Sequence, residues 1–573
     1  MSASQLFLEY MLRASKYALI LLSLAIIIRC IRSMLREQYE PETWAYIRTG
    51  DGRFPVNHWE NILGRAASSD VRIDKKGVSR THAVLTRNDR GIWQVYDIFA
   101  RSGVWVNGVR VGEHGLRVND RDVINLGGVC VRFQEISPEK REKLEEKRSA
   151  PGRGVSPAVT LLELTLFQLF LLMQHAILSK QEHLPAIALG FAALAIMQWS
   201  CYNAMRVIGR SGFEVETLAF YLTSLGFSVV AASAPEEMYK QALLALLAVV
   251  LFLLCGVWLR SLKRTEQMRL PVALAALVLL GLNLVFGREI NGARNWIILG
   301  GFSIQPSELV KAAYVYVSAS TLDRLFRRGN LFGFIAFSAL CVGALALLGD
   351  FGTALIFFVS FLIIAFIRSG SIATVFLALA GAGMAGMLAV SVKPHIARRF
   401  ASWGRAWADR WGTGYQQTRA MSAAAAGGLF GKGAGAGWLH DLRLNAAANT
   451  DLVFGLVCEE LGLLIALCAM AAVLILVFFA LRSARNGRSA YYAIASCAAM
   501  TMLLFQMGLN VFGSMDLLPF TGVPFPFVSK GGSSLLCCWM LMAFIKGADN
   551  RKDASFAVRP GLKLFRGKQE AGA

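Results

Sequence analysis

Long apolar blocks dominate the pattern of hydrophobic and polar positions along the 573-residue chain. Four of them are near bilayer length and carry few or no charges, at 242–259, 270–286, 331–348 and 461–479. One such block would also suit a buried helix of a soluble domain, but so many in one chain predict a polytopic α-helical membrane protein. We count about thirteen spans, at 17–28, 160–178 and 184–201 and about ten more between 215 and 545.

A different pattern fills residues 40–136, the only long stretch without such a block. Short alternating runs at 92–96, 103–106 and 129–133, broken by Gly, Asn and Asp, predict an all-β domain. A charged run and then a stretch rich in Ser, Pro and Gly follow it, which is typical of a linker. The chain therefore divides into an N-terminal membrane anchor (1–39), the all-β domain (40–136), a charged linker (137–158), two additional membrane helices (159–204), a helical core (214–550) and a basic tail (551–573).

The first apolar stretch, 17–28, resembles the core of a signal peptide. No small-residue cleavage site follows it, whereas Arg29, Arg32 and Arg36 do. We therefore interpret this stretch as a retained anchor.

The net charge of +21 is compatible with nucleic acid or with membrane lipid as a partner. Much of the charge lies in short connections between apolar blocks, which favours lipid and speaks against nucleic acid. When the spans are threaded alternately with the all-β domain in the cytoplasm, the short basic connections and the basic tail also fall in the cytoplasm. The long connection 393–450 falls outside although it is basic, and its cations suit either lipid headgroups or a substrate with a pyrophosphate.

The ten Cys and seven His are scattered along the chain. They form neither a disulfide framework nor a set with metal-ligand spacing, so we predict no metal centre built from these residues. Apolar packing is the role expected for the Cys.

The all-β domain carries spaced motifs, which are Leu-Gly-Arg at 63–65, Val-Ser-Arg-Thr-His-Ala at 78–83, Val-Asn-Gly at 106–108 and a polar run at 120–127. Together and in this order they resemble the forkhead-associated (FHA) domain, a β-sandwich that binds phosphothreonine peptides through its apical loops. The resemblance therefore predicts an inserted all-β FHA sandwich whose partner is a protein that carries phosphothreonine.

A phosphate dianion needs a guanidinium fork and hydroxyl or amide donors. The family's Ser/Thr-Asn-Gly is Arg101-Ser102-Gly103 in this chain, so Ser102 replaces an Asn that holds the peptide and Arg101 adds a cation. An FHA fold that docks a partner without phosphate is the alternative. The predicted phosphopeptide site consists of Arg65, Ser79, Arg80, Arg101, Ser102 and Asn107.

Four signatures lie in the helical core, at 292–311, 349–353, 414–462 and 524–534. They include Gly-Asp-Phe-Gly-Thr at 349–353 and Asn-Thr-Asp at 449–451. In this order and spacing they resemble the SEDS family (shape, elongation, division and sporulation) over residues 215–550. The resemblance implies a ten-helix core in the bacterial cytoplasmic membrane and the polymerisation of lipid II into peptidoglycan glycan strands. It also implies a class B penicillin-binding transpeptidase as a partner.

Glycan extension from a lipid pyrophosphate needs a base for the attacking hydroxyl and positive charge for the leaving pyrophosphate. From spacing alone, Asp451 suits the cap of a following helix. The resemblance implies instead that it is the essential acid, which fits the role of catalytic base. Lys432, Arg443, another cation of the 393–450 connection or a divalent cation would supply the positive charge.

Trp296, Lys530 and Ser533 complete the predicted substrate site. Trp296 matches a Trp that the family uses near its cavity, although an anchor at the membrane interface is the plain alternative. Lys530 stands where the family has Tyr, and Asn449 stands where the family has His before the essential acid.

Glu308 and Lys311 lie three residues apart on a predicted helix and therefore share a face. They form a polar pair that either fixes helix packing or faces a water-filled cavity.

Three functions suit this pattern. The leading hypothesis is a peptidoglycan glycosyltransferase that is regulated or localised by the FHA domain. A lipid II flippase would also need many spans around a polar cavity. A cell-wall scaffold without catalysis would recruit its partners through the FHA domain alone.

Overall fold

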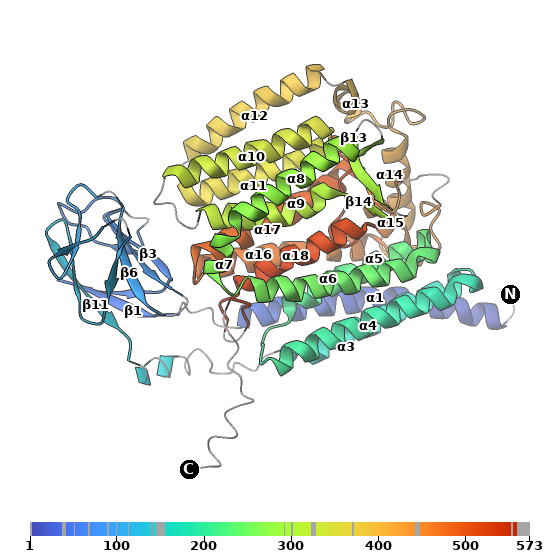
Figure 1. Ribbon diagram of the computed structural model, residues 1–573. Helices are drawn as coiled ribbons and strands as arrows, with labels where there is room; N and C mark the ends of the chain where they lie inside the picture. Colours follow the sequence, from blue (N-terminus) through green and yellow to red (C-terminus); the bar gives the residue numbers. More distant parts are fainter. Residues whose placement is uncertain are drawn as a thin grey trace, which may run out of the picture.

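The computed structural model has two parts, a β-sandwich and a larger bundle of helices beside it (Figure 1). It describes residues 3–36, 42–50, 52–66, 69–88, 91–98, 100–112, 114–137, 139–140, 143–144, 155–290, 293–299, 302–322, 328–369, 372–392, 394–441, 447–551 and 554–557.

The predicted β-sandwich is formed by two facing sheets. One has the strand order β2-β1-β11-β10-β7-β8 and the other β4-β3-β5-β6-β9. Alternate side chains such as Ile47, Leu85, Val95 and Phe133 are fully buried between the sheets, which explains the alternation in the sequence. The strands are β1 Ala45–Thr49, β2 Gly52–Val56, β3 Glu60–Gly64, β4 Val71–Arg72, β5 Ala83–Arg87, β6 Trp93–Asp97, β7 Val104–Val106, β8 Val109–Arg110, β9 Leu116–Val118, β10 Val123–Leu126 and β11 Val129–Glu135.

Thirteen helices of the described residues are 16 to 34 residues long. Nine of them are long and apolar enough to cross a membrane, and Phe351–Ile367 and Gly532–Gly547 are shorter apolar helices. The thirteen are α1 Ala3–Arg36, α3 Pro157–Leu178, α4 Leu184–Val207, α5 Glu214–Ser233, α6 Met238–Trp258, α8 Arg269–Phe286, α9 Pro306–Leu322, α10 Arg328–Leu348, α11 Phe351–Ser369, α12 Ile372–Val392, α16 Leu463–Arg485, α17 Ala490–Ser514 and α18 Gly532–Gly547.

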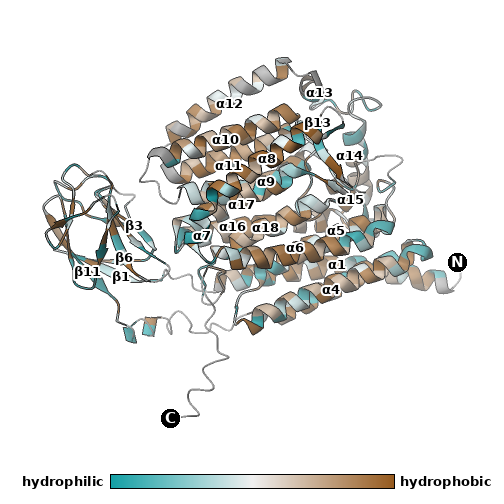
Figure 2. Ribbon diagram, in the orientation of Figure 1, coloured by the Kyte–Doolittle hydropathy of each residue, from teal (hydrophilic) through white to brown (hydrophobic). Residues whose placement is uncertain are grey.

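The outer helices of the bundle present apolar side chains to their surroundings. Leu243 and Leu254 of α6 and Leu274 and Val285 of α8 are each more than half exposed. Hydrophobic residues predominate along the helices, and hydrophilic ones gather at their ends (Figure 2). An apolar surface of this extent suits hydrocarbon rather than water, so the protein is a multi-pass membrane protein.

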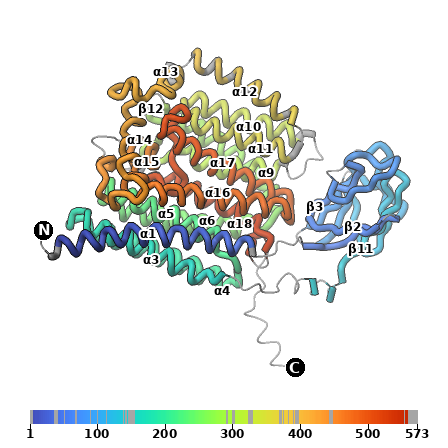
Figure 3. The backbone as a smooth tube through the Cα atoms, turned by 180° about the vertical axis from the view of Figure 1, so that it is seen from behind, coloured from blue at the N-terminus to red at the C-terminus, as the bar shows by residue number. Residues whose placement is uncertain are grey.

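Shorter elements occupy the end of the bundle that lies away from the β-sandwich (Figures 1 and 3). The sequence predicts plain connections there, because runs this short have no clear period. The structure instead has a three-stranded sheet of β12 Arg288–Ile290, β13 Ala293–Leu299 and β14 Phe302–Ile304, and the helices α13 Pro394–Ser402, α14 Tyr415–Gly427 and α15 Val453–Glu460. The remaining short helices are η1 Gln181–His183, η2 Pro235–Glu237 and α7 Leu262–Gln267, of which α7 lies at the end nearer the β-sandwich (Figure 1).

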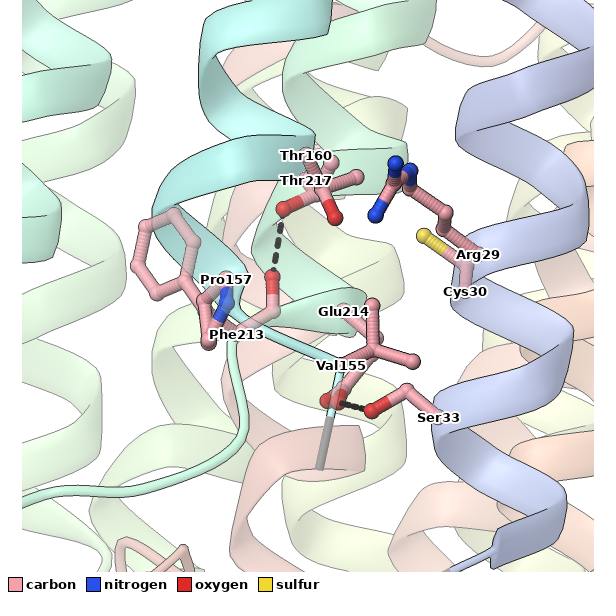
Figure 4. A pocket seen from close by; sticks show the side chains of 9 residues that line it. All are labelled: Arg29, Cys30, Ser33, Val155, Pro157, Thr160, Phe213, Glu214 and Thr217. Carbon is pink, nitrogen blue, oxygen red and sulfur yellow. Dashed lines mark hydrogen bonds between the residues drawn. The ribbon is translucent and has the colours of Figure 1, made fainter. Parts of the chain in front are cut away.

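The N-terminal anchor is an integral part of the bundle. Helix α1 packs against α3 and α16, α3 packs against α5, and α4 packs against α6. Near the β-sandwich these helices enclose a small pocket, in which the Ser33 hydroxyl of α1 donates to Oε1 of Glu214 over 2.5 Å (Figure 4). The other carboxylate oxygen of Glu214 accepts from Arg551 over 2.7 Å. The anchor is therefore tied to the C-terminal end of the core.

Candidate functional site

The four signatures of the helical core meet at the end of the bundle that lies away from the β-sandwich. The Lys530 N–H donates to the Asn449 carbonyl over 2.8 Å, which joins the fourth signature to the third. The Gln305 N–H donates to the Ser533 hydroxyl over 3.0 Å, which joins the first signature to the fourth across 228 positions. Segments that are far apart in the sequence thus surround one site.

Asp451 lies at the centre of this site and is partly exposed. The side-chain amide of Asn510 on α17 donates to the carbonyl of Asp451 over 2.9 Å and to that of Val523 over 2.8 Å. Gly522 has a φ of +70°, and a Cβ there would lie 3.3 Å from Oδ2 of Asp451. Helix α17 therefore holds the backbone of Asp451, and the segment around Gly522 passes close to its carboxylate.

Arg399 of α13 is the cation that the structure brings to the acid. Its Nη1 donates to the Thr521 carbonyl over 3.3 Å, next to the glycine that contacts Asp451. Burial raises the pKa of Asp451 to about 6; the charge of Asp350 adds to this rise in pKa, whereas the charge of Arg399 opposes it. A carboxylate with such a pKa is largely ionised at neutral pH and still basic enough to accept a proton.

Within the Gly-Asp-Phe-Gly-Thr signature, Asp350 forms hydrogen bonds at the start of α11 and Gly352 allows a close approach of two segments. Oδ1 of Asp350 accepts from the Thr353 N–H over 3.1 Å at the start of α11, and Oδ2 accepts from the Ser307 hydroxyl over 3.4 Å. A Cβ at Gly352 would lie 2.5 Å from Cγ2 of Val523 and 3.1 Å from Cβ of Thr521, so glycine lets α11 approach the segment over Asp451. The second signature therefore shapes the site and places a second acid in it.

Lys432, a predicted substrate contact, is paired in a separate cluster. Its ammonium lies 2.6 Å from Oε1 of Glu459, whose side chain is fully buried. The same carboxylate accepts from the N–H groups of Trp438 and Leu439 over 3.1 and 2.9 Å. The charge of Lys432 therefore serves to fold its own loop, by neutralising Glu459.

The other predicted substrate residues lie at various distances from the acid. Lys530 pairs with Glu237 of η2 over 2.7 Å, although its backbone borders the site. Trp296 lies on β13 opposite Arg288, and no contact of the described residues joins it to Asp451. Arg443 lies outside the described residues.

Glu308 and Lys311 are buried beneath the site and form the predicted pair, with Nζ of Lys311 2.7 Å from Oε1 of Glu308. Lys311 also donates to Gln506 of α17 over 2.8 Å, and Gln506 donates to the Pro524 carbonyl over 2.9 Å. The pair thus links α9, α17 and the fourth signature, which agrees with a role in helix packing.

Within the residues that the structure describes, no group of three or more His, Cys, Asp or Glu is arranged to hold a metal ion. The site combines instead a carboxylate that can accept a proton with a guanidinium that can hold an anion. From the sequence, Arg399 counts only among the other cations of the 393–450 connection, and no role is predicted for Asp350 or Asn510. A polar Asn inside an apolar span was the available signal for Asn510, whereas nothing in the sequence separates Arg399 from its basic neighbours.

Five of the six residues predicted to bind a phosphopeptide lie together at one end of the sandwich. The N–H of Arg65 donates to the Ser79 carbonyl over 3.0 Å, and the hydroxyl of Ser102 donates to the Gly77 carbonyl over 3.2 Å. The fully buried His82 accepts from the Ser79 N–H over 2.9 Å and lies 3.1 Å from the Gly103 carbonyl, so it holds two of these loops together. Arg65, Arg80 and Arg101 are exposed cations of this end.

Asn107 lies apart from this group, at the end of β7 that is remote from Gly103. It has a φ of +49°, and its side chain donates to Asp122 over 2.8 Å and accepts from the Val123 N–H over 3.0 Å. The structure therefore gives Asn107 a role in a turn and does not bring it to the loops around Arg65.

Comparison with known proteins agrees with this arrangement. The FtsW/RodA/SpoVE family, described as "Cell cycle protein", matches residues 219–553, and the FHA domain family matches residues 61–127. The chain is 32% identical over 360 residues to the "Probable peptidoglycan glycosyltransferase FtsW" of Tolumonas auensis, which covers 60% of this chain and 93% of that protein. It is 28% identical over 343 residues to the "Peptidoglycan glycosyltransferase RodA" of Mycobacterium tuberculosis, which covers 56% and 72%.

A solved chain described as "Structural coordination of polymerization and crosslinking by a peptidoglycan synthase complex" superimposes with a TM-score of 0.51 at 26% identity. The superposition covers 60% of this chain and 98% of the solved one. The helices α1, α3 and α4 precede the region matched by the family. The chain therefore belongs to the FtsW/RodA/SpoVE family and carries an FHA domain ahead of its helical core.

Proposed function

We propose that this protein is a peptidoglycan glycosyltransferase that polymerises lipid II at the outer face of the bacterial cytoplasmic membrane. The observation that carries the proposal is the partly exposed carboxylate of Asp451, on which the charge of Arg399 acts from its place at the Thr521 carbonyl, next to Gly522. The four signatures that surround this pair come from the whole length of the core. Relatives named as peptidoglycan glycosyltransferases match the same region.

In the proposed reaction, a sugar hydroxyl of one lipid II molecule or glycan strand attacks the anomeric carbon of the other substrate. Asp451 accepts the hydroxyl proton as the new glycosidic bond forms. The bond between the anomeric carbon and the pyrophosphate breaks at the same time, and the lipid diphosphate leaves. Arg399, a cation of the same 393–450 connection, stabilises the negative charge on the leaving pyrophosphate in place of Lys432.

A divalent cation would supply additional positive charge for the leaving group. Magnesium is often bound by one or two carboxylates together with substrate phosphates. The carboxylates of Asp350 and Asp451 would hold such an ion together with the pyrophosphate oxygens.

The FHA domain lies in the cytoplasm in this proposal, at the opposite end of the core from Asp451. Its cationic loops bind a phosphothreonine-containing protein, with Arg65, Ser79 and Arg80 as the main contacts. Membrane lipids surround the apolar helices, and a class B penicillin-binding transpeptidase is the second protein partner. Ser102 braces its loop against Gly77, so an exposed cation such as Arg101 takes over part of the role of the Asn that it replaces.

The proposal is tested with the purified full chain in nanodiscs and labelled lipid II, with and without a class B transpeptidase. We expect glycan strands from the wild-type chain and none from Asp451→Asn. A flippase would instead move labelled lipid II across a vesicle membrane without lengthening it. A scaffold would do neither with its partner present, and either result would refute a glycosyltransferase. Titration with EDTA and Mg²⁺ tests the divalent ion.

A further inference from the structure

The FHA domain contacts the helical core with the end of its sandwich opposite its cationic loops, at the connection between α16 and α17. The Trp59 N–H donates to the Arg488 carbonyl over 2.5 Å, and the ring of His58 is hydrogen-bonded to the Gly487 carbonyl. The indole of Trp59 packs edge-on against Tyr492, with the ring centroids 6.3 Å apart. We call this contact, between residues 58–60 of the FHA domain and residues 487–492 of the core, the dock. Strand β3 is the strand nearest the core in Figure 3.

Glu60, the first residue of β3, closes the N-terminal end of α17. Its Oε1 accepts from the Ser489 hydroxyl over 3.0 Å, and its Oε2 accepts from the Ala490 N–H over 2.9 Å. The first N–H groups of a helix have no partner within the helix, and a carboxylate there also meets the positive end of the helix dipole. The FHA domain thus contributes a cap to a helix of the core.

Arg488 joins the same domain to the end of α18. Its Nε lies 2.8 Å from Oε2 of Glu42, just before the first strand of the sandwich. Its Nη1 donates to the Asp549 carbonyl over 3.0 Å, and its Nη2 donates to the Asn550 carbonyl over 3.5 Å. The side chains of Arg488 and Glu42 are only 8% and 16% exposed, so the pair is well shielded from solvent.

The two helices that end at the dock are those that hold the candidate catalytic acid. Asn510, near the far end of α17, bonds the carbonyls of Asp451 and Val523. Ser529, shortly before α18, donates to the Thr450 carbonyl over 2.5 Å. The FHA domain therefore contacts one end of each helix, and the residues at the other end of each helix bond the loop that carries the acid.

We propose that Glu60 and Glu42 are positioning residues of the transferase, which hold α17 and α18 so that the Asp451 loop keeps its reactive geometry. This inference rests on the proposed function, because it gives the FHA domain a task within that enzyme. Strand β3 runs from Glu60 in the dock to Gly64, which precedes the exposed Arg65. A phosphorylated segment of a partner protein at Arg65 is thereby connected to the catalytic loop and changes turnover rather than the affinity for lipid II.

The test compares Glu60→Ala, Glu60→Gln and the control Glu139→Ala in the full chain in nanodiscs, with lipid II as substrate. Glu139 is an exposed acid in the segment after the sandwich. We expect kcat to fall roughly fivefold in Glu60→Ala with KM unchanged, because the lost cap loosens α17 and with it the Asp451 loop. Glu60→Gln keeps an oxygen that accepts from the Ala490 N–H and should restore most of the rate. Hydrogen exchange should become faster at 486–492 and at 447–453 in Glu60→Ala alone.

Several outcomes would overturn the inference. Faster exchange at 486–492 with an unchanged kcat would limit Glu60 to local structure, and unchanged exchange there would mean that the dock is absent in the membrane. A phosphothreonine peptide that binds the wild type should alter its kcat but not that of Glu60→Ala, and an equal effect on both would exclude coupling through the dock. Failure of the wild-type chain to make any strands would instead refute the proposed function.

Discussion

Lys432 and Arg399 belong to the same basic connection between α12 and α15, yet the fold uses their charges differently. The ammonium of Lys432 is neutralised by the buried Glu459, which also binds two backbone N–H groups. The Arg399 side chain donates to the Thr521 carbonyl, and its charge acts on Asp350 and Asp451. One cation therefore stabilises a loop, whereas the other is placed to meet an anion.

This difference shows that the number of cations in a loop does not identify those that bind substrate. A charge whose partner is a fully buried carboxylate is committed to folding, because separating the pair would leave that carboxylate without its counter-ion. The guanidinium of Arg399, whose charge acts on two acids of the site, can still donate hydrogen bonds to a bound anion. The two cations predict opposite outcomes when each is neutralised.

The largest effect is expected for the acid beside Arg399. Asp451→Asn keeps the shape of the side chain but removes the base, so the rate of glycan synthesis should fall roughly 1,000-fold without loss of folding. In the wild type, the rate should also fall about tenfold for each pH unit below about 6, because protonated Asp451 cannot accept a proton. Polymerisation of labelled lipid II across pH 5 to 8 measures both. Asp441→Asn, in the same connection, serves as the control and should leave both unchanged.

Arg399→Gln should lower kcat/KM for lipid II by roughly 100-fold, since one preorganised donor to the leaving pyrophosphate is lost. The charge of Arg399 lowers the pKa of Asp451, so its removal should raise that pKa and shift the acidic limb of the rate profile to higher pH. The same assay measures both effects. Arg398→Gln, at the exposed neighbouring position, is the matched control. If Arg399→Gln had a normal rate and an unshifted acidic limb of its pH–rate profile, Arg399 would not differ from Lys432 in its role.

Glu459→Gln should reduce the free energy of unfolding by about 3 kcal/mol, because a buried partner of Lys432 and of two backbone donors loses its charge. Thermal unfolding of the nanodisc-embedded chain measures the change, with the exposed Glu139→Gln as reference. The rate constants of the molecules that remain folded should be nearly normal. A stable variant that is catalytically dead would instead place Lys432 and Glu459 in the reaction.

Sequence patterns predicted the membrane helices and the sandwich well, because long apolar blocks and the alternation of apolar and polar residues in strands can be recognised directly. The short sheet at Ala293–Leu299 has no such pattern and was missed. Asp451 was found only through the family resemblance, since its spacing also suits a helix cap. The partner of Lys432 is Glu459, 27 positions away, and that of Arg399 is the Thr521 carbonyl, 122 positions away. Such pairings are created by tertiary packing, so the sequence ranked Lys432 above Arg399.

The smallest effect is expected for Lys432→Gln, and it sharpens the comparison most. The Gln amide still donates to Glu459, and the N–H groups of Trp438 and Leu439 remain in place. The unfolding free energy should therefore fall by only about 1 kcal/mol, and kcat/KM for lipid II should stay within about threefold of the wild type. The thermal assay used for Glu459→Gln and the polymerisation assay used for Arg399→Gln measure these values. If Lys432→Gln lost as much activity as Arg399→Gln at equal stability, pairing with a buried acid would not exclude a cation from substrate binding in this fold.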